Sequence, residues 1–438
     1  MQRARTCGIM GNGIQRGLCL LLGVLMSAHA AFCPSWTSSQ CPLADNTMTR
    51  FETELTENMA GQPQAFFAIR KVLAQNVAKF ADRNPNPPSM LSATRAWKKL
   101  DNAVSISTVI DANTTSRAAA LVENTLDYTM SYFGRKSSPA SPKTPDRPLF
   151  MHFSGPTGVG KSMTADVIAR SMFQSTFNSA QELCGRLSFL MNDFASQKPS
   201  DIKRNLAEIR KKVAEQLYHC PRSVLIFDEV QAVPEEVLDG TIDIFDHEGS
   251  APLHFDGSPV VTSSCVVIVI SDMGSTKLNP GMDRIAARHA VEQDAQERFT
   301  NSRKKALLNN VVPFLPLSVE DLAQVAVMEL KQLNGRLARE YRGVWGGTIT
   351  WQKEVPSWLA ERCHDELTCY DDGGRGVETV VTHEVQSVVE DALLEECSQV
   401  SASDKVSYNN IHISVDEGAG EVTAAVDTVF DKKEFKEL

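Results

Sequence analysis

Short continuous apolar runs alternate with helical repeats through the middle of the chain. The runs at 149–153, 223–227 and 265–270 are typical of strands buried on both faces. Shorter strands are expected at 188–191 and 311–314, and helical spacing at 161–173 and 201–217. Alternating strands and helices predict an α/β fold, a parallel sheet with helices on both sides.

Beyond residue 316 the pattern changes. Ser318 is predicted to be an N-cap, and acidic residues follow it in the first turn of a helix that is expected to run to about residue 341. A second long helix is expected at 379–397. Alternating residues at 411–415 and 422–426 predict a β-hairpin. A smaller α-rich domain with a C-terminal β-hairpin is therefore predicted at 317–438.

The first thirty residues predict a secretory signal peptide. They carry arginines but no acid, and an apolar run at 18–26 precedes Ala28-His29-Ala30, which predicts cleavage before Ala31. A mitochondrial transit peptide or a retained anchor is the alternative. Residues 31–60 are polar and predict a loosely ordered arm.

A helix is expected at 61–80, and an insertion between two proline-rich tracts at 84–147, with one helix at 118–133. In an oxidising compartment some of the cysteines after residue 30 are expected to pair. Cys363 and Cys369 could pair or stay as two buried thiols. The formal net charge of −10 argues against a general nucleic-acid binder.

The strongest chemical signal is a glycine-rich loop between the first strand and its helix, with the pattern G-x-x-x-x-G-K-[ST]. Its residues are Gly155, Pro156, Thr157, Gly158, Val159, Gly160, Lys161 and Ser162. In such a loop the backbone N–H groups hold phosphate oxygens. Lys161 is expected to reach the β/γ-phosphates and Ser162 to bind Mg²⁺, so ATP and Mg²⁺ are the expected ligands.

A second motif is the strand at 224–228, which ends in Asp228 and Glu229. Asp228 is placed to hold Mg²⁺ or its water. Glu229 is placed to activate an attacking water as general base.

Together the two motifs resemble the AAA+ ATPases, and more narrowly their torsin and Clp branch. The segments that carry the resemblance are 155–162, 222–229, 312–317 and 373–375. It implies an AAA+ P-loop domain at 61–316 and a lid domain at 317–438. Gly61-Gln62 resembles the Gly-Gln box of this branch, which implies that Gln62 lies near the adenine pocket.

Two other segments resemble different families, one the torsins and the other the Clp proteins. The stretch 218–223 is torsin-like and implies that Cys220 pairs with Cys33 or Cys41. Gly373-Gly374-Arg375 is similar to the Clp sensor, which implies that Arg375 touches the γ-phosphate from the lid.

Two departures from the family pattern concern catalysis. Asp272 stands where the family usually has Asn, and an ionised Asp only accepts hydrogen bonds. One interpretation is that Asp272 makes hydrolysis slow. The alternative is that Asp272 is protonated or turned away from the phosphate. By register against 314–317, the arginine-finger position of the Clp proteins falls at Leu307, and the nearest cations are at 303–305. Torsins take the finger from a membrane-anchored partner, and the alternative is Arg303 on a shifted loop.

The resemblance implies a torsin-like ATPase of the endoplasmic reticulum lumen or nuclear envelope, with the mitochondrion as the alternative location. It would hydrolyse Mg-ATP with an activator's arginine finger, remodel or release protein clients, and form oligomers with itself or the activator. No aromatic-Val-Gly loop occurs at 163–222, so threading of polypeptide is not expected. A Clp-like chaperone acting alone and an ATP-binding scaffold with little catalysis are the alternatives.

Overall fold

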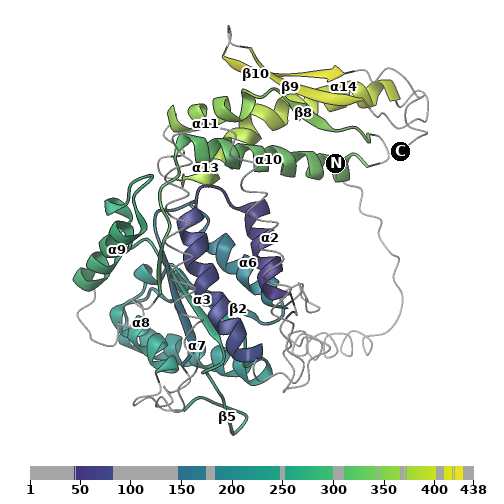
Figure 1. Ribbon diagram of the computed structural model, residues 1–438. Coiled ribbons are helices and arrows are strands. Elements are labelled where there is room, and N and C mark those ends of the chain that lie inside the picture. The colour runs from purple at the N-terminus through teal and green to yellow at the C-terminus, as the bar shows by residue number, and fades with distance from the viewer. Residues whose placement is uncertain are drawn as a thin grey trace, which may run out of the picture.

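The computed structural model describes residues 44, 46–81, 147–173, 183–246, 252–298, 310–342, 345–365, 369, 372–400, 409–416, 418 and 420–427. They form a large domain and, above it in Figure 1, a smaller one. The large domain contains α2 (Thr47–Asn58), α3 (Pro63–Ala81), β1 (Leu149–Ser154), α6 (Lys161–Phe173), β2 (Arg186–Leu190), η1 (Met191–Phe194), α7 (Pro199–His219), β3 (Val224–Asp228), η2 (Val230–Ala232), α8 (Glu235–Ile242), η3 (Asp243–Phe245), β4 (His254–Phe255), β5 (Ser258–Pro259), β6 (Val266–Ser271), η4 (Ser275–Lys277), α9 (Arg284–Arg298) and β7 (Val311–Pro313).

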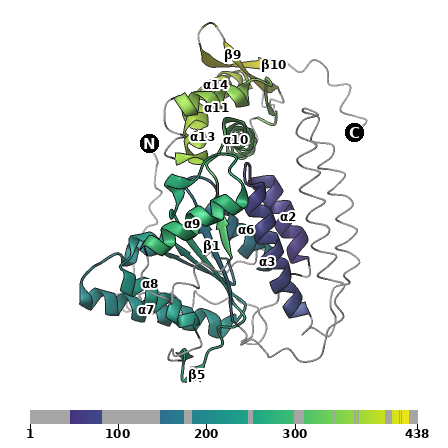
Figure 2. The same cartoon turned by 60° about the vertical axis from the view of Figure 1, so that its left-hand side comes forward.

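The large domain is built on a parallel five-stranded sheet with the order β2-β3-β6-β1-β7. Helices α2, α3 and α6 cover one face, and α7 and α8 cover the other (Figure 2). Every residue of the central strand β6 is buried, as expected for a strand covered on both sides. The predicted α/β fold class is confirmed. The carboxyl ends of β1, β3 and β6 lie at one edge, where open sheets of this kind bind ligands.

The structure contradicts the loosely ordered arm predicted for residues 31–60, because α2 occupies 47–58. Thr47, Phe51 and Leu55 recur every four residues and are buried on one helix face. Phe51 stacks on Phe66 of α3 with the ring centroids 6.0 Å apart. Two ion pairs, Glu52 with Arg70 and Glu54 with Arg170, add to this contact. The apolar signal of α2 in a polar segment was too weak to predict a helix.

The smaller domain packs its helices against a three-stranded sheet of order β10-β9-β8. Its elements are α10 (Val319–Glu340), β8 (Ile349–Trp351), α11 (Val355–Asp365), α13 (Gly374–Val380), the π-helical turn η6 (Val381–Gln386), α14 (Ser387–Val400), β9 (Asn410–Asp416) and β10 (Glu421–Asp427). Ser318 caps α10 in a capping box with Asp321, which confirms the predicted N-cap. The predicted hairpin is confirmed, and β8 adds a parallel strand to it that was not predicted.

Four cysteines of the described part of the chain are disulfide-bonded. Cys363 and Cys369 form a disulfide with their Cα atoms 5.3 Å apart, which decides between the two alternatives left by the sequence. Cys184 and Cys220 are also disulfide-bonded, whereas Cys265 is a buried free thiol. The partner of Cys220 stays a prediction, since Cys33 and Cys41 lie outside the described residues.

Several other predictions fall outside the described part of the chain. They concern the targeting segment at 1–30, all but the last residue of the insertion at 84–147 with its helix at 118–133, the cations at 303–305 and Leu307. Within the described ranges, none of the helices combines the length and apolarity needed to cross a bilayer.

Candidate functional site

The phosphate loop connects β1 to α6 and lies directly against the lid. Gly158 and Gly160 have φ angles of +73° and +93°, which favour glycine. The backbone N–H of Gly374 donates a hydrogen bond to the Gly158 carbonyl over 3.0 Å. A Cβ atom on Gly158 would lie 1.7 Å from the carbonyl oxygen of Asp372. The loop therefore needs a glycine at 158 both for its backbone conformation and for the approach of the lid.

Lys161, the first residue of α6, folds back over the loop. Its Nζ donates to the carbonyls of Gly155 (2.7 Å) and Pro156 (2.5 Å). Burial lowers the pKa of Lys161 to about 8; the charge of Asp228 opposes this shift, and that of Arg375 adds to it. The ammonium group would gain from an anion at this position.

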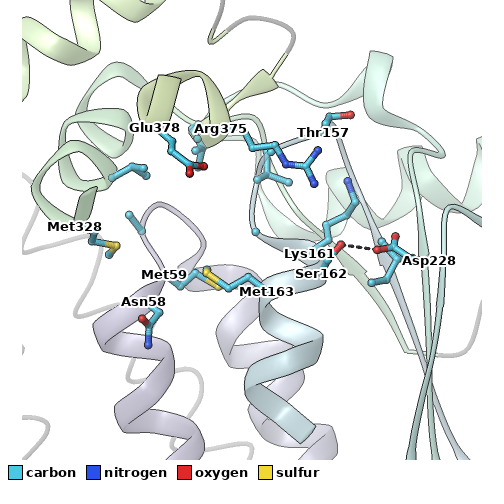
Figure 3. A pocket seen from close by; sticks show the side chains of 18 of the residues that line it. Asn58, Met59, Thr157, Lys161, Ser162, Met163, Asp228, Met328, Arg375 and Glu378 are labelled. Atoms are coloured by element: carbon cyan, nitrogen blue, oxygen red, sulfur yellow. Dashed lines mark hydrogen bonds between the residues drawn. The ribbon is translucent and has the colours of Figure 1, made fainter. Parts of the chain in front are cut away.

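Ser162 and Asp228 meet at the same edge of the sheet. The Ser162 hydroxyl donates to Asp228 Oδ2 over 2.7 Å, drawn as the dashed line in Figure 3. Hydroxyl and carboxylate oxygens are ligands that Mg²⁺ accepts together with phosphate oxygens. This pair beside Lys161 therefore fits a magnesium ion that accompanies a nucleotide.

Glu229 follows Asp228 at the end of β3, in a left-handed conformation with a φ angle of +60°. Its Oε2 accepts a hydrogen bond from Asn192 Nδ2 over 3.1 Å. The sequence interpretation missed Asn192. It lies just after β2, which is the neighbour of β3 in the sheet, and that adjacency could have identified it.

The end of β6 supplies the next group. Ser271 is buried and hydrogen-bonded to His152 Nε2 over 2.7 Å, and its hydroxyl lies 3.3 Å from that of Ser154. Asp272 follows, lines the same pocket as Lys161, and its negative charge raises the pKa of that lysine. The structure therefore places Asp272 among the phosphate-loop residues.

The lid closes the pocket from the other side. Arg375 and Glu378 of α13 and Met328 of α10 line a cavity of about 260 Å³, together with Met59 from the end of α2. Figure 3 shows the Arg375 guanidinium directed toward the side of Lys161 and Thr157. Residues that are far apart in the sequence thus surround one cavity between the two domains.

Gln62, expected to contact the nucleotide, has a different position. It is buried, and its side chain does not belong to the lining of this cavity. Its Nε2 donates to the Leu315 carbonyl (2.7 Å), and its Oε1 accepts from the Leu315 N–H (3.0 Å). The structure thus assigns Gln62 to holding the segment after β7, which leads to Leu317 at the pocket wall.

Comparison with known proteins gives two kinds of match. Residues 135–227, which contain the phosphate loop and most of β3, match the family model named Torsin. The chain is also 23% identical over 262 residues to the chaperone protein ClpB of Tropheryma whipplei (strain TW08/27), covering 59% of this chain and 35% of that protein. These matches, with the phosphate loop and the acidic strand end, support a similarity of this chain to the torsin and Clp branch of the AAA+ ATPases.

Two further ClpB proteins match this chain at similar levels. ClpB of Staphylococcus epidermidis (strain ATCC 35984) is 25% identical over 291 residues, or 61% of this chain and 30% of that protein. ClpB of Meiothermus ruber is 25% identical over 263 residues, or 56% of this chain and 28% of that protein. The matches thus span only about a third of the length of these relatives.

Proposed function

We propose that this chain binds Mg-ATP between its two domains and hydrolyses it. The observation that carries the proposal is the 2.7 Å hydrogen bond between Ser162 and Asp228, with Lys161 and Glu229 beside it in one cavity. Phosphate loops of this type hold the β- and γ-phosphates, and the acidic strand end completes the metal and water positions.

Five side chains of the pocket have roles in this proposal. Lys161 exchanges its two carbonyl partners for phosphate oxygens, and Ser162 and Asp228 hold the magnesium ion. Magnesium, when bound, neutralises charge on the phosphate oxygens. Glu229 leaves Asn192 and takes a proton from the attacking water, while Arg375 stabilises the γ-phosphate from the lid.

The proposed activity is torsin-like: a lumenal ATPase that remodels or releases protein clients with help from a membrane-anchored activator. The match of residues 135–227 to the Torsin model and the signal-like first thirty residues support this assignment. The activator would supply the arginine finger that the sequence lacks at Leu307, which is worth roughly 10³ to 10⁵ in rate. Self-assembly, or assembly with the activator, would bring that arginine to the pocket.

Two other functions have specific support. The ClpB relatives favour a chaperone that acts without an activator. Asp272 favours an ATP-binding scaffold with little catalysis, because a second negative charge beside Lys161 opposes the approach of phosphate. The three functions differ in the turnover expected of the isolated chain.

Phosphate release by the purified chain with Mg-ATP, beside an equilibrium titration of ATP binding, tests these functions. Glu229→Gln removes the proposed base and keeps the shape of the side chain. Glu236→Gln is the matched control, since Glu236 is exposed at the start of α8 and lies outside the pocket lining.

The torsin-like proposal expects tight ATP binding with little turnover until an activator is added. Turnover by the chain alone, abolished by Glu229→Gln and kept by Glu236→Gln, would instead support the Clp-like function. ATP binding without turnover, whichever partner is added, would support the scaffold function. A chain that does not bind ATP would refute all three.

A further inference from the structure

Two carboxylates line the pocket on the lid side, away from the phosphate loop. Glu329 lies on α10 and Glu378 on α13. In Figure 3 the Glu378 carboxylate is directed into the cavity on the side of Met59 and Met328. The two cations of the pocket lining, Lys161 and Arg375, are both at the phosphate-loop end. The pocket therefore has a basic end suited to phosphates and a second end where acids are exposed to the cavity.

The helix α13 fixes the order of these groups. Arg375 and Glu378 are three residues apart, so they share one face of the helix and differ by about 4.5 Å in rise. Arg375 lies beside the phosphate loop, and Glu378 lies one turn further from it. A nucleotide whose phosphates occupy the loop places its sugar next along the same direction. Glu378 therefore lines the pocket one helical turn from Arg375, on the side where a sugar attached to loop-bound phosphates would lie.

Glu329 is in a partly closed environment. It shares the pocket face of α10 with Val325, Met328 and Gln332. Burial raises the pKa of Glu329, and the nearby charge of Glu378 raises it further. Glu329 is partly buried and Glu378 is exposed. Their mutual repulsion is relieved when a ligand brings hydrogen-bond donors to them.

The positive charge of Arg336 offsets these two effects on Glu329 only in part. Arg336 lowers the pKa of Glu329 less than burial and Glu378 raise it. The Arg336 guanidinium donates a 2.7 Å hydrogen bond to Gln386 Oε1 and does not line the pocket. The acceptor capacity of the acid pair is therefore open to the cavity.

We propose that Glu329 and Glu378 bind the sugar of the nucleotide, with their carboxylate oxygens accepting hydrogen bonds from the ribose hydroxyls. This rests on the proposed function, because the phosphate loop must hold the triphosphate. Carboxylates only accept, hydroxyls donate, and hydrogen bonds to a charged acceptor are stronger than neutral ones. The acid pair thereby makes the pocket selective for ribonucleotides over deoxyribonucleotides.

Equilibrium titrations of the full chain with Mg-ATP, Mg-2′-deoxy-ATP and Mg-3′-deoxy-ATP test this. A hydrogen bond to a charged group contributes roughly 1.5–3 kcal/mol, so at least one deoxy form should bind about tenfold more weakly or worse. Glu329→Gln and Glu378→Gln keep side-chain size and remove the charge. In these variants ATP binding should weaken while deoxy-ATP binding stays unchanged, so that the ratio approaches one. Glu361→Gln, an exposed glutamate of α11 outside the pocket lining, is the control.

Equal affinity of the unmodified chain for ATP and both deoxy forms would overturn the sugar site. Equal weakening of all three ligands by Glu329→Gln or Glu378→Gln would also overturn it, because that pattern assigns the acids to the base or to the structure of the lid. Complete absence of ATP binding would instead refute the proposed function. Because each variant is judged by a ratio of ligands, partial misfolding does not change the result.

Discussion

Gly158→Ala tests whether the lid rests on the phosphate loop before any nucleotide is bound. The added Cβ would lie 1.7 Å from the Asp372 carbonyl oxygen and 3.1 Å from the Gly373 Cα. To reach an ordinary contact distance the lid turn must move by roughly 1–2 Å. That movement would break the 3.0 Å hydrogen bond from the Gly374 N–H to the Gly158 carbonyl.

The loss of stability expected for Gly158→Ala has two contributions, and a control variant separates them. An L-residue in the left-handed conformation costs about 1–2 kcal/mol. Loss of one backbone hydrogen bond costs about 0.5–1.5 kcal/mol more. Gly257→Ala has only the first cost, because Gly257 has the same φ angle of +73° and no atom within 4 Å of the added Cβ. The difference between the variants measures the contact with the lid.

Hydrogen exchange at the Gly374 amide is the local assay, with denaturant unfolding of both variants beside it. We expect exchange of this amide to become about two- to tenfold faster in Gly158→Ala and to stay unchanged in Gly257→Ala. ATP affinity should fall in Gly158→Ala alone, because Arg375 moves away with the lid turn. Equal exchange at Gly374 in the two variants would refute the reasoning.

Three other predictions concern the pocket and its support. ATP affinity should fall about tenfold per pH unit above pH 8, since only the charged Lys161 attracts phosphate and its free-state pKa is about 8. Titrations across pH should show this loss in the unmodified chain, and an equally steep profile for Lys161→Arg would contradict it. Gln62→Ala should lower the free energy of unfolding by about 2–4 kcal/mol, because two buried hydrogen bonds to Leu315 are lost. Denaturant titration measures this, and lost ATP affinity at unchanged stability would instead make Gln62 a nucleotide contact. Asn192→Ala should raise basal phosphate release about fivefold at unchanged ATP affinity. The reason is that Glu229 no longer has to break its hydrogen bond to Asn192, which is worth about 1 kcal/mol, before it can act as the base. An unchanged rate would refute this role of Asn192.

The central part of the large domain could be predicted because its information is local in the sequence. The apolar runs that became β1, β3 and β6 are continuous, and α6 begins and ends at the predicted residues, Lys161 and Phe173. The phosphate loop and the acidic strand end also have fixed local patterns. Parallel strands bring their carboxyl ends to one edge, so these two motifs had to converge once the fold class was known.

What could not be predicted depends on tertiary contacts. The helix α2 is stabilised by Phe51 and Leu55, whose side chains are buried when α2 packs against α3 and α6. Strand β8 has three residues and exists because β9 lies beside it. Gln62 and Asn192 are polar residues whose partners, Leu315 and Glu229, are set by neighbours in space. A sequence gives no period or motif for such pairs.

The turn that carries Arg375 is held at two points before nucleotide arrives. On the lid side the Gly373 N–H donates to the Cys369 carbonyl over 3.0 Å, and Cys369 is tied by its disulfide to Cys363 of α11. On the other side the Gly374 N–H donates to the phosphate loop. The turn that carries Arg375 is therefore positioned in advance, and it adds little ordering cost to nucleotide binding. In the torsin-like proposal, insertion of the activator's arginine into the pocket is then the step that controls turnover. Adding the activator should therefore raise the hydrolysis rate far more than it raises ATP affinity.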